Sequence, residues 1–175
     1  MSALHQACAS GDLATVELIL TQGSCDPNQR DEDWSCKSPL HWAAAGGHTE
    51  VVQLLLSHGA RSCLQTEQGW SAAHFAAQSG RLGVLRVLHV HHAPLDQRDR
   101  SGDTARRIAQ IYGHKDCATF LLKAESECQA HRRAAALRGI KLDEEDERWN
   151  QEEEERREKG ERRDERGGGR RREED

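Results

Sequence analysis

Apolar residues recur in the first 124 positions at spacings typical of short amphipathic helices. The segment TEVVQLLLSHG places five aliphatic side chains at such spacings, and LATVELILTQG, LGVLRVLHVHH and KDCATFLLKA repeat the pattern. A shorter alanine-rich run precedes these segments, as in HWAAAGG and HFAAQSG, and polar stretches with turn residues separate the copies. We therefore predict a unit made of a helix, a tight turn, a second helix and a projecting turn.

The ends of the alanine-rich helices carry matching signals. A hydroxyl residue stands where the helix should begin, because its oxygen accepts a hydrogen bond from a free backbone N–H. Pro39 occupies one first helical position, where its missing N–H costs nothing. A glycine stands where the helix should end. These residues are Ser38, Ser71 and Thr104 at the starts, and Gly47, Gly80 and Gly113 at the ends.

The units repeat with a nearly constant period. His41 and His74 lie 33 residues apart, and the upstream segment LHQACASGD and the downstream segment DTARRIAQIYGH complete four copies. One helix pair cannot bury both of its apolar faces, so neighbouring copies must stack to form a continuous core. The sequence thus predicts an all-α solenoid of four helix-turn-helix repeats with projecting turns.

The repeated motif resembles that of the ankyrin-repeat family. SPLHWAAAGGH is similar to the family pattern T-P-L-H-x-A-A-x-x-G-H, and SAAHFAAQSGR and TARRIAQIYGH follow it more loosely. The resemblance covers residues 1–124 and divides them into repeats at about 1–33, 34–66, 67–99 and 100–124.

The chain departs from the family pattern in the first turn and the last repeat. Three extra residues lie between Gly23 and Asp33, which predicts an enlarged first projecting turn. Cys36 stands where the family usually has glycine, so this turn should be irregular. In the last repeat Arg106 and Arg107 replace Leu and His, and polar substitution there fits a capping role.

Members of the family bind proteins through the projecting turns and the concave side of the first helices. The resemblance therefore implies a non-enzymatic protein–protein interaction module, an intracellular scaffold or adaptor, with a protein partner. In the turns the implied contact positions are Trp34, Ser35, Lys37, Glu67, Gln68, Trp70, Arg100, Ser101 and Asp103. On the helices they are Ala45, Gly46, Gln78, Ser79, Ile111 and Tyr112.

Two of the four tryptophans, Trp34 and Trp70, fall on adjacent projecting turns. Tryptophan and arginine are over-represented among residues that anchor interfaces, so both tryptophans are candidate contacts, together with Arg100 and Tyr112. The alternative for Trp70 is that its ring packs against its own turn. Trp42 is expected to belong to the framework, because its position faces the stack.

The ten histidines do not form a recognisable metal site in the sequence. His5, His41 and His74 occupy the repeat position whose ring, in the family, hydrogen-bonds the backbone between units. The HVHH cluster lacks the four regularly spaced ligands of a structural zinc site. No phosphate loop and no nucleophile–base signature is present, so we expect no metal, no cofactor and no catalytic group.

Asn28 is a candidate modification site. Asp26 lies two residues before it and Leu20 lies eight residues before it. This spacing resembles that of the asparagine that oxygenases hydroxylate in many ankyrin repeats, although Pro27 replaces the usual aliphatic residue.

Charge is concentrated after the repeats. The chain of 175 residues has a formal net charge of −5, and the segment 143–175 holds sixteen acidic and ten basic residues. The preceding segment 125–142 should contain a helix, capped by Ser126 and ended by Gly139, that covers the last repeat. Residues 143–175 then form a charged tail, either marginally helical or disordered.

The remaining body is nearly neutral and lacks the basic surface of a nucleic-acid-binding domain, so we expect no nucleic-acid partner. The alternative function is a nucleic-acid or chromatin accessory protein driven by the tail and its RGGGRRRE segment. Six cysteines follow no disulfide spacing, which favours an intracellular location, cytoplasmic or nuclear. A redox or metal sensor that uses these cysteines and the histidines is a third hypothesis.

The segment MSALHQACASGD does not read as a targeting signal, and the longest apolar runs are too short to span a membrane. We expect a monomer with no membrane contact.

Overall fold

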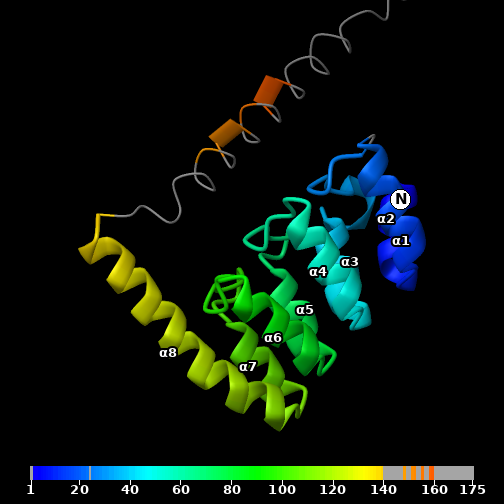
Figure 1. The fold of residues 1–175 in the computed structure, drawn as a ribbon. Helices are drawn as coiled ribbons and strands as arrows, with labels where there is room; N and C mark the ends of the chain where they lie inside the picture. The colour runs from blue at the N-terminus through cyan, green and yellow to red at the C-terminus, as the bar shows by residue number, and fades with distance from the viewer. Residues whose placement is uncertain are drawn as a thin grey trace, which may run out of the picture. The chain divides into compact units, whose positions relative to one another are not determined.

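The structure, a computed structural model, describes residues 2–23 and 25–139 and, beyond them, residues 148, 151–152, 155 and 158–159. Within these residues it contains eight α-helices, one 3-10 helix and no β-strand (Figure 1). The all-α repeat solenoid expected from the sequence is confirmed. The elements are α1 (Ala3–Ser10), α2 (Leu13–Gln22), η1 (Glu32–Trp34), α3 (Pro39–Gly46), α4 (Thr49–Ser57), α5 (Ala72–Gln78), α6 (Leu82–Val90), α7 (Ala105–Ile111) and α8 (Lys115–Leu137).

The helices of the repeats pack in two layers. In the first-helix layer, α1, α3, α5 and α7 contact one another in sequence order (Figure 1). In the second-helix layer, α2, α4 and α6 each pack on the first helix of their own repeat. Small side chains allow the close approach within the first-helix layer, where Ala43, Ala44, Ala76, Ala77 and Ala109 are fully buried. Each repeat therefore completes its core only against its neighbours.

Three buried histidines, which we call the histidine ladder, hydrogen-bond each repeat to the turn that follows it. The ring nitrogen Nε2 faces a backbone carbonyl oxygen of that turn region in every case. The distances are 2.9 Å from His5 to Gln29, 2.9 Å from His41 to Leu64 and 2.9 Å from His74 to Asp103. The backbone role expected for these three histidines is confirmed.

The histidines of the ladder are neutral, and hydrogen bonds with the backbone define the tautomer of His41 and His74. In His41, Nδ1 accepts a hydrogen bond from the backbone N–H of Ser38 at 2.9 Å, so Nε2 carries the proton that is donated to the carbonyl of Leu64. The N–H of Ser71 meets Nδ1 of His74 in the same way, at 3.1 Å. Burial lowers the pKa of His41 to about 4, because the charged ring would lose its hydration. The hydrogen bond to Leu64 acts in the opposite direction and is weaker.

A second set of histidines links the tight turn of one repeat to the end of the first helix of the preceding repeat. Nε2 of His48 lies 3.2 Å from the carbonyl of Ala9, and Nε2 of His114 lies 2.9 Å from the carbonyl of Gln78. A Cβ atom at Gly80 would come within 2.7 Å of the His114 ring, so only glycine permits this approach.

Three projecting turns join consecutive repeats: the first at residues 31–37, the second at 66–70 and the third at 99–103. Each closes with a hydrogen bond from the backbone N–H of its first residue to the carbonyl of its last, at 3.0, 2.9 and 2.9 Å respectively. The first turn is therefore two residues longer than the others, and the 3-10 helix η1 fills the difference.

The enlargement lies further along the chain than the sequence spacing indicated. Two of the three extra residues lie inside the first turn, between Asp31 and Lys37, and the third lies before Asp31. The irregular geometry expected at Cys36 is present, since Ser35 and Cys36 have φ values of 59° and 60°. This left-handed conformation usually favours glycine, so Ser35 and Cys36 adopt it at a cost in free energy.

The last helix is longer than expected. Helix α8 begins at Lys115 and continues through Ser126, so the prediction that Ser126 caps a separate helix is wrong. The boundary expected at 124/125 falls inside α8. The hydroxyl of Ser126 donates instead to the carbonyl of Leu122 at 3.4 Å, one helical turn earlier. Gly139, with φ 71°, follows the end of the helix as predicted.

Helix α8 covers the end of the stack, with Leu121 and Ala124 buried in the common hydrophobic core and with polar pairs beside them. Arg106 of α7 pairs with Glu125 at 3.2 Å, which agrees with the capping role expected for the last repeat. Burial raises the pKa of Glu125, and Arg106 opposes that shift. Nε2 of His89, at the end of α6, lies 2.5 Å from the carboxylate of Glu127.

Internal packing divides the chain into two compact units, Met1–Arg133 and Ala134–Asp175. All contacts discussed below lie within the first unit. Apart from its six described helical residues, the charged tail at 143–175 lies outside the described residues, so its helical or disordered character stays a prediction. None of the helices in the described ranges combines the length and the apolarity that crossing a membrane requires.

Candidate protein-binding surface

Trp34 lies at the tip of the first projecting turn. Its backbone N–H donates to the carbonyl of Asp31 at 3.1 Å, and the N–H of Asp33 donates to the Asp31 carboxylate at 3.2 Å. These hydrogen bonds fix the turn without help from the indole, which is 49% exposed. The largest apolar side chain is thus presented to solvent on an ordered turn, which is the arrangement expected of a contact residue.

The indole of Trp34 begins a continuous row of side chains. Trp34 meets the ring of Trp42 edge-on at 5.8 Å, and Trp70 meets the ring of Phe75 edge-on at 5.1 Å. The ammonium group of Lys37 joins the two pairs, because it lies 4.5 Å from the Trp42 centroid and 5.2 Å from the Phe75 centroid. We call these five residues the aromatic platform. The first two projecting turns, α3 and α5 contribute to it.

Two members of the aromatic platform were not expected from the sequence. Trp42 was assigned to the framework, but it is only half-buried and it contacts both Trp34 and Lys37. Its indole N–H is buried and has no hydrogen-bond partner among the described residues. Its ring is held by these ring contacts and by packing against the hydrophobic core, which agrees with the framework role expected for it. Phe75 is half-buried in the next repeat. Its position, one residue after the ladder histidine, corresponds to that of Trp42, and this correspondence was the available signal.

Trp70 is held by its surroundings. Its indole N–H donates to the carboxylate of Asp99 at 3.1 Å, and its ring stacks on His74 at 5.9 Å. The alternative interpretation, in which Trp70 packs against the turns, therefore describes the chain without a partner. Its half-exposed ring still borders the platform at Phe75.

The first and second turns are linked to each other. The backbone N–H of Glu67 donates to the carbonyl of Ser35 at 3.1 Å, and the thiol of Cys36 donates to the Glu67 carboxylate at 3.7 Å. In the same way the carbonyl of Gln68 accepts from the N–H of Arg100 at 3.0 Å. The candidate residues Ser35, Glu67 and Gln68 therefore lie along one edge, with Glu67 and Gln68 exposed.

The third turn presents Arg100 and Ser101 to solvent. The carboxylate of Asp99 holds the turn, because it accepts from the backbone N–H groups of Ser101 at 2.9 Å and Asp103 at 2.8 Å. Asp103 is half-buried, and its carbonyl receives the bond from His74. Arg100 and Ser101 are accordingly better placed for contact than Asp103.

The remaining candidates form a separate group at the far ends of α5 and α7. The amide of Gln78 donates to the hydroxyl of Tyr112 at 3.0 Å. Ile111 and Tyr112 are 57% and 52% exposed, which is high for apolar side chains at the end of a helix. The structure thus sorts the sequence candidates into a turn-side group around the aromatic platform and a helix-end group around Tyr112.

Asn28 bridges two repeats with its side chain. Its amide nitrogen donates to the carbonyl of Gly59 at 3.1 Å, and its amide oxygen accepts from the backbone N–H of Arg61 at 2.7 Å. Hydroxylation of Asn28 stays a prediction. Intact-mass analysis of protein from cells, followed by fragmentation, checks it by the presence or absence of one added oxygen atom on this residue.

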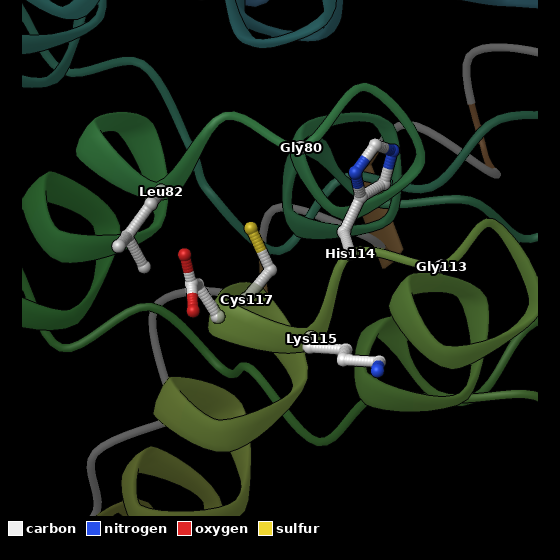
Figure 2. Close-up of a pocket in the computed structure, with 7 residues that line it drawn as sticks. Gly80, Leu82, Gly113, His114, Lys115 and Cys117 are labelled. Carbon is white, nitrogen blue, oxygen red and sulfur yellow. The ribbon is translucent and has the colours of Figure 1, made fainter.

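A shallow pocket of about 330 Å³ lies beside the tight turns of the last two repeats (Figure 2). Figure 2 shows the ring of His114 beside Gly80 and the thiol of Cys117 near Leu82. The ring is already engaged with the carbonyl of Gln78, and burial raises the pKa of Cys117, which disfavours the nucleophilic thiolate. The pocket thus lies at a junction between repeats, where the His114 ring stabilises the packing of the repeats.

Elsewhere in the described part of the chain, the rings of His92 and His131 stack at 4.2 Å. None of the six cysteines forms a disulfide, and burial raises the pKa of Cys8 to about 12. No group of three or more potential ligands with metal-binding geometry exists among the described residues.

Comparison with known proteins identifies the family. A model of three successive ankyrin repeats matches residues 4–99 and 62–134, which together are well over half of the chain. The chain therefore belongs to the ankyrin-repeat family. Ankyrin repeats are protein–protein interaction modules, and the family is generally non-enzymatic.

Individual relatives match only short stretches. Human espin-like protein is 40% identical over 48 residues, which are 27% of this chain and 5% of that protein. Bovine ankyrin repeat and SOCS box protein 2 is 44% identical over 55 residues, which are 31% of this chain and 9% of that protein. The chain thus spans less than a tenth of each of these relatives.

Proposed function

We propose that this protein is an intracellular scaffold or adaptor, active as a monomer, that binds a protein partner through its projecting turns and the adjoining face of the first-helix layer. The observation that carries the proposal is the aromatic platform. It combines the exposed indole of Trp34 with the half-buried rings of Trp42, Phe75 and Trp70 on turns that hydrogen bonds hold in place. Such rings provide much contact area with few rotatable bonds, as interface anchors do.

The location and the absence of catalysis are parts of this proposal. Six cysteines that form no disulfide support an intracellular compartment, and the engaged polar groups of the Figure 2 pocket support a surface-based function. Within this proposal, Arg100 contacts the partner from the third turn. Tyr112 contacts the partner from the helix-end group.

A quantitative pull-down from cells tests the proposal. The intact chain is compared with Trp34→Ala, which leaves the turn's hydrogen bonds in place, and with Leu18→Ala as the matched control. Leu18 is also a large exposed apolar residue, at 58%, but it lies on α2 in the second-helix layer. We expect specific partners to be lost with Trp34→Ala and kept with Leu18→Ala, while both variants retain the helical circular dichroism of the intact chain. Equal recovery by all three proteins contradicts the proposal.

A further inference from the structure

We infer that the aromatic platform binds an extended segment of the partner through an arginine or lysine side chain, which lies against the platform rings between the acidic tips of the first two turns. The inference rests on the proposed function, because it names the chemistry of the partner at the same surface.

The rings of the platform already hold a cation. The Lys37 ammonium lies over the faces of both Trp42 and Phe75, at 4.5 and 5.2 Å from their centroids. Ring faces carry a negative electrostatic potential and attract ammonium and guanidinium groups within about 6 Å. Lys37 is half-buried and emerges from the last position of the first turn, on a flexible stem. The unbound protein therefore shows the position that a partner's cation would share with Lys37 or take over from it.

Exposed carboxylates lie on the two turns that contribute to the platform. Glu32 and Asp33 are exposed beside Trp34, and Glu67 is exposed on the second turn. The bonds of Glu67 to Ser35 and Cys36 keep the two acidic tips adjacent. The positive charges near this position are those of Lys37 and the half-buried Arg30, both of which act on His41, and the three exposed carboxylates, which we call the acidic rim, outnumber them. A basic segment is therefore favoured over an acidic one, and a phosphate-rich nucleic acid or an anionic membrane surface is disfavoured.

The charge changes sign along the row of turns. Arg98, just before the third turn, and Arg100 on it are exposed, whereas the carboxylates of Asp99 and Asp103 on this turn are only half-exposed. The exposed positive charges repel a basic side chain. The partner's cation is thus directed to the first two turns, where Trp34 supplies an additional exposed ring. Steric access agrees with this placement, because Trp34 is the most exposed aromatic side chain of the platform.

The test uses the full chain as bait for a phage-displayed library of random linear peptides. A selected peptide is then synthesised with a fluorescent label and titrated by anisotropy, together with an analogue in which every Arg and Lys is replaced by Gln. We expect selected sequences to be enriched in Arg or Lys, and the Gln analogue to lose binding. Trp34→Ala should raise the Kd about tenfold or more, as expected for an interface anchor.

Charge variants distinguish the contribution of the acidic rim to binding from that of the rest of the surface. The pair Glu32→Gln and Asp33→Asn should raise the Kd roughly three- to tenfold at low salt, with the effect fading at high salt. The pair Glu17→Gln and Glu50→Gln removes the same charge from exposed sites on α2 and α4 and should leave the Kd unchanged. Lys37→Met should lower the Kd several-fold, because it removes the competing ammonium. Circular dichroism confirms that each variant is folded.

Several results would overturn the inference. Peptides that require Trp34 but contain no basic residue would contradict it while leaving the proposed function intact. Basic peptides whose Kd is unchanged by Trp34→Ala and by the rim variants would also contradict it, as would a library that yields no binder. In either case the pull-down would test the proposed function separately. Loss of peptide binding at high protein concentration would indicate a second copy on the platform and would contradict it as well.

Discussion

The histidine ladder makes a quantitative prediction about pH. His41 has a pKa of about 4 in the folded chain, against 6.5 for the free side chain. Between these values the unfolded chain binds a proton that the folded chain does not bind, so stability is lost as the pH falls. Protonation of Nδ1 would also break its hydrogen bond with the N–H of Ser38, which is why the folded state resists the proton.

The magnitude follows from the two pKa values. Between about pH 7.5 and about pH 5.5, proton uptake by His41 in the unfolded chain should remove about 1.4 kcal/mol from the free energy of unfolding. Burial lowers the pKa of His5 and His74 too, and both add to the loss. The raised pKa of Glu125 acts in the opposite direction. A comparison with a His41 variant isolates the contribution of that ring.

Urea unfolding followed by far-UV circular dichroism, at both pH values, measures the effect. His41→Gln should be less stable at neutral pH, but its loss on acidification should be smaller than that of the intact chain by about 1.4 kcal/mol. The control is His58→Gln, at an exposed position after α4, which should keep the full loss. An intact chain with equal stability at both pH values, or a His41→Gln variant with an undiminished loss, would refute the reasoning.

Three further predictions concern the joints between repeats. Asn28→Ala should lower the free energy of unfolding by about 1–3 kcal/mol, because it leaves two inter-repeat hydrogen-bonding groups without a partner; urea titration measures this, and Asn28→Asp should retain the accepting half. Gly69→Ala should cost about 1–2 kcal/mol or more. The reason is that Gly69 has φ 82° and a Cβ there would meet the backbone nitrogen of Arg100 at 2.8 Å, and thermal melting should show the loss. Arg106→Leu should cost about 1–3 kcal/mol by leaving a largely buried Glu125 unpaired, and hydrogen exchange should show faster exchange in α7 first; unchanged protection there would contradict the capping role.

The fold was predictable because each repeat carries the same local sequence signals. The 33-residue period, the capping hydroxyls and the glycines are local signals, and the equivalent roles of His41 and His74 follow from their recurrence at one position of the unit. These signals do not depend on how neighbouring side chains pack, so the sequence alone was sufficient for the layers and for the ladder.

The chemistry of the surface was less accessible to sequence reasoning. The place of Lys37 between Trp42 and Phe75 depends on the distance between a turn and the first helices of two repeats. The two residues inserted before Lys37 were placed too early in the chain by the sequence spacing. Local propensity also misled at Ser126, where the helix formers on both sides continue α8 in spite of the capping preference of serine.

The central claim is that the turns and the adjoining first helices form the binding surface. Photo-crosslinking in cells tests it most directly, with a photoreactive residue at Gln68 on the second turn or at Val90 on α6, both of which are exposed. The account predicts that the partner recovered with the intact chain is crosslinked from Gln68 and not from Val90. Crosslinking from Val90 without crosslinking from Gln68 would contradict the account, because it would place the partner on the second-helix layer.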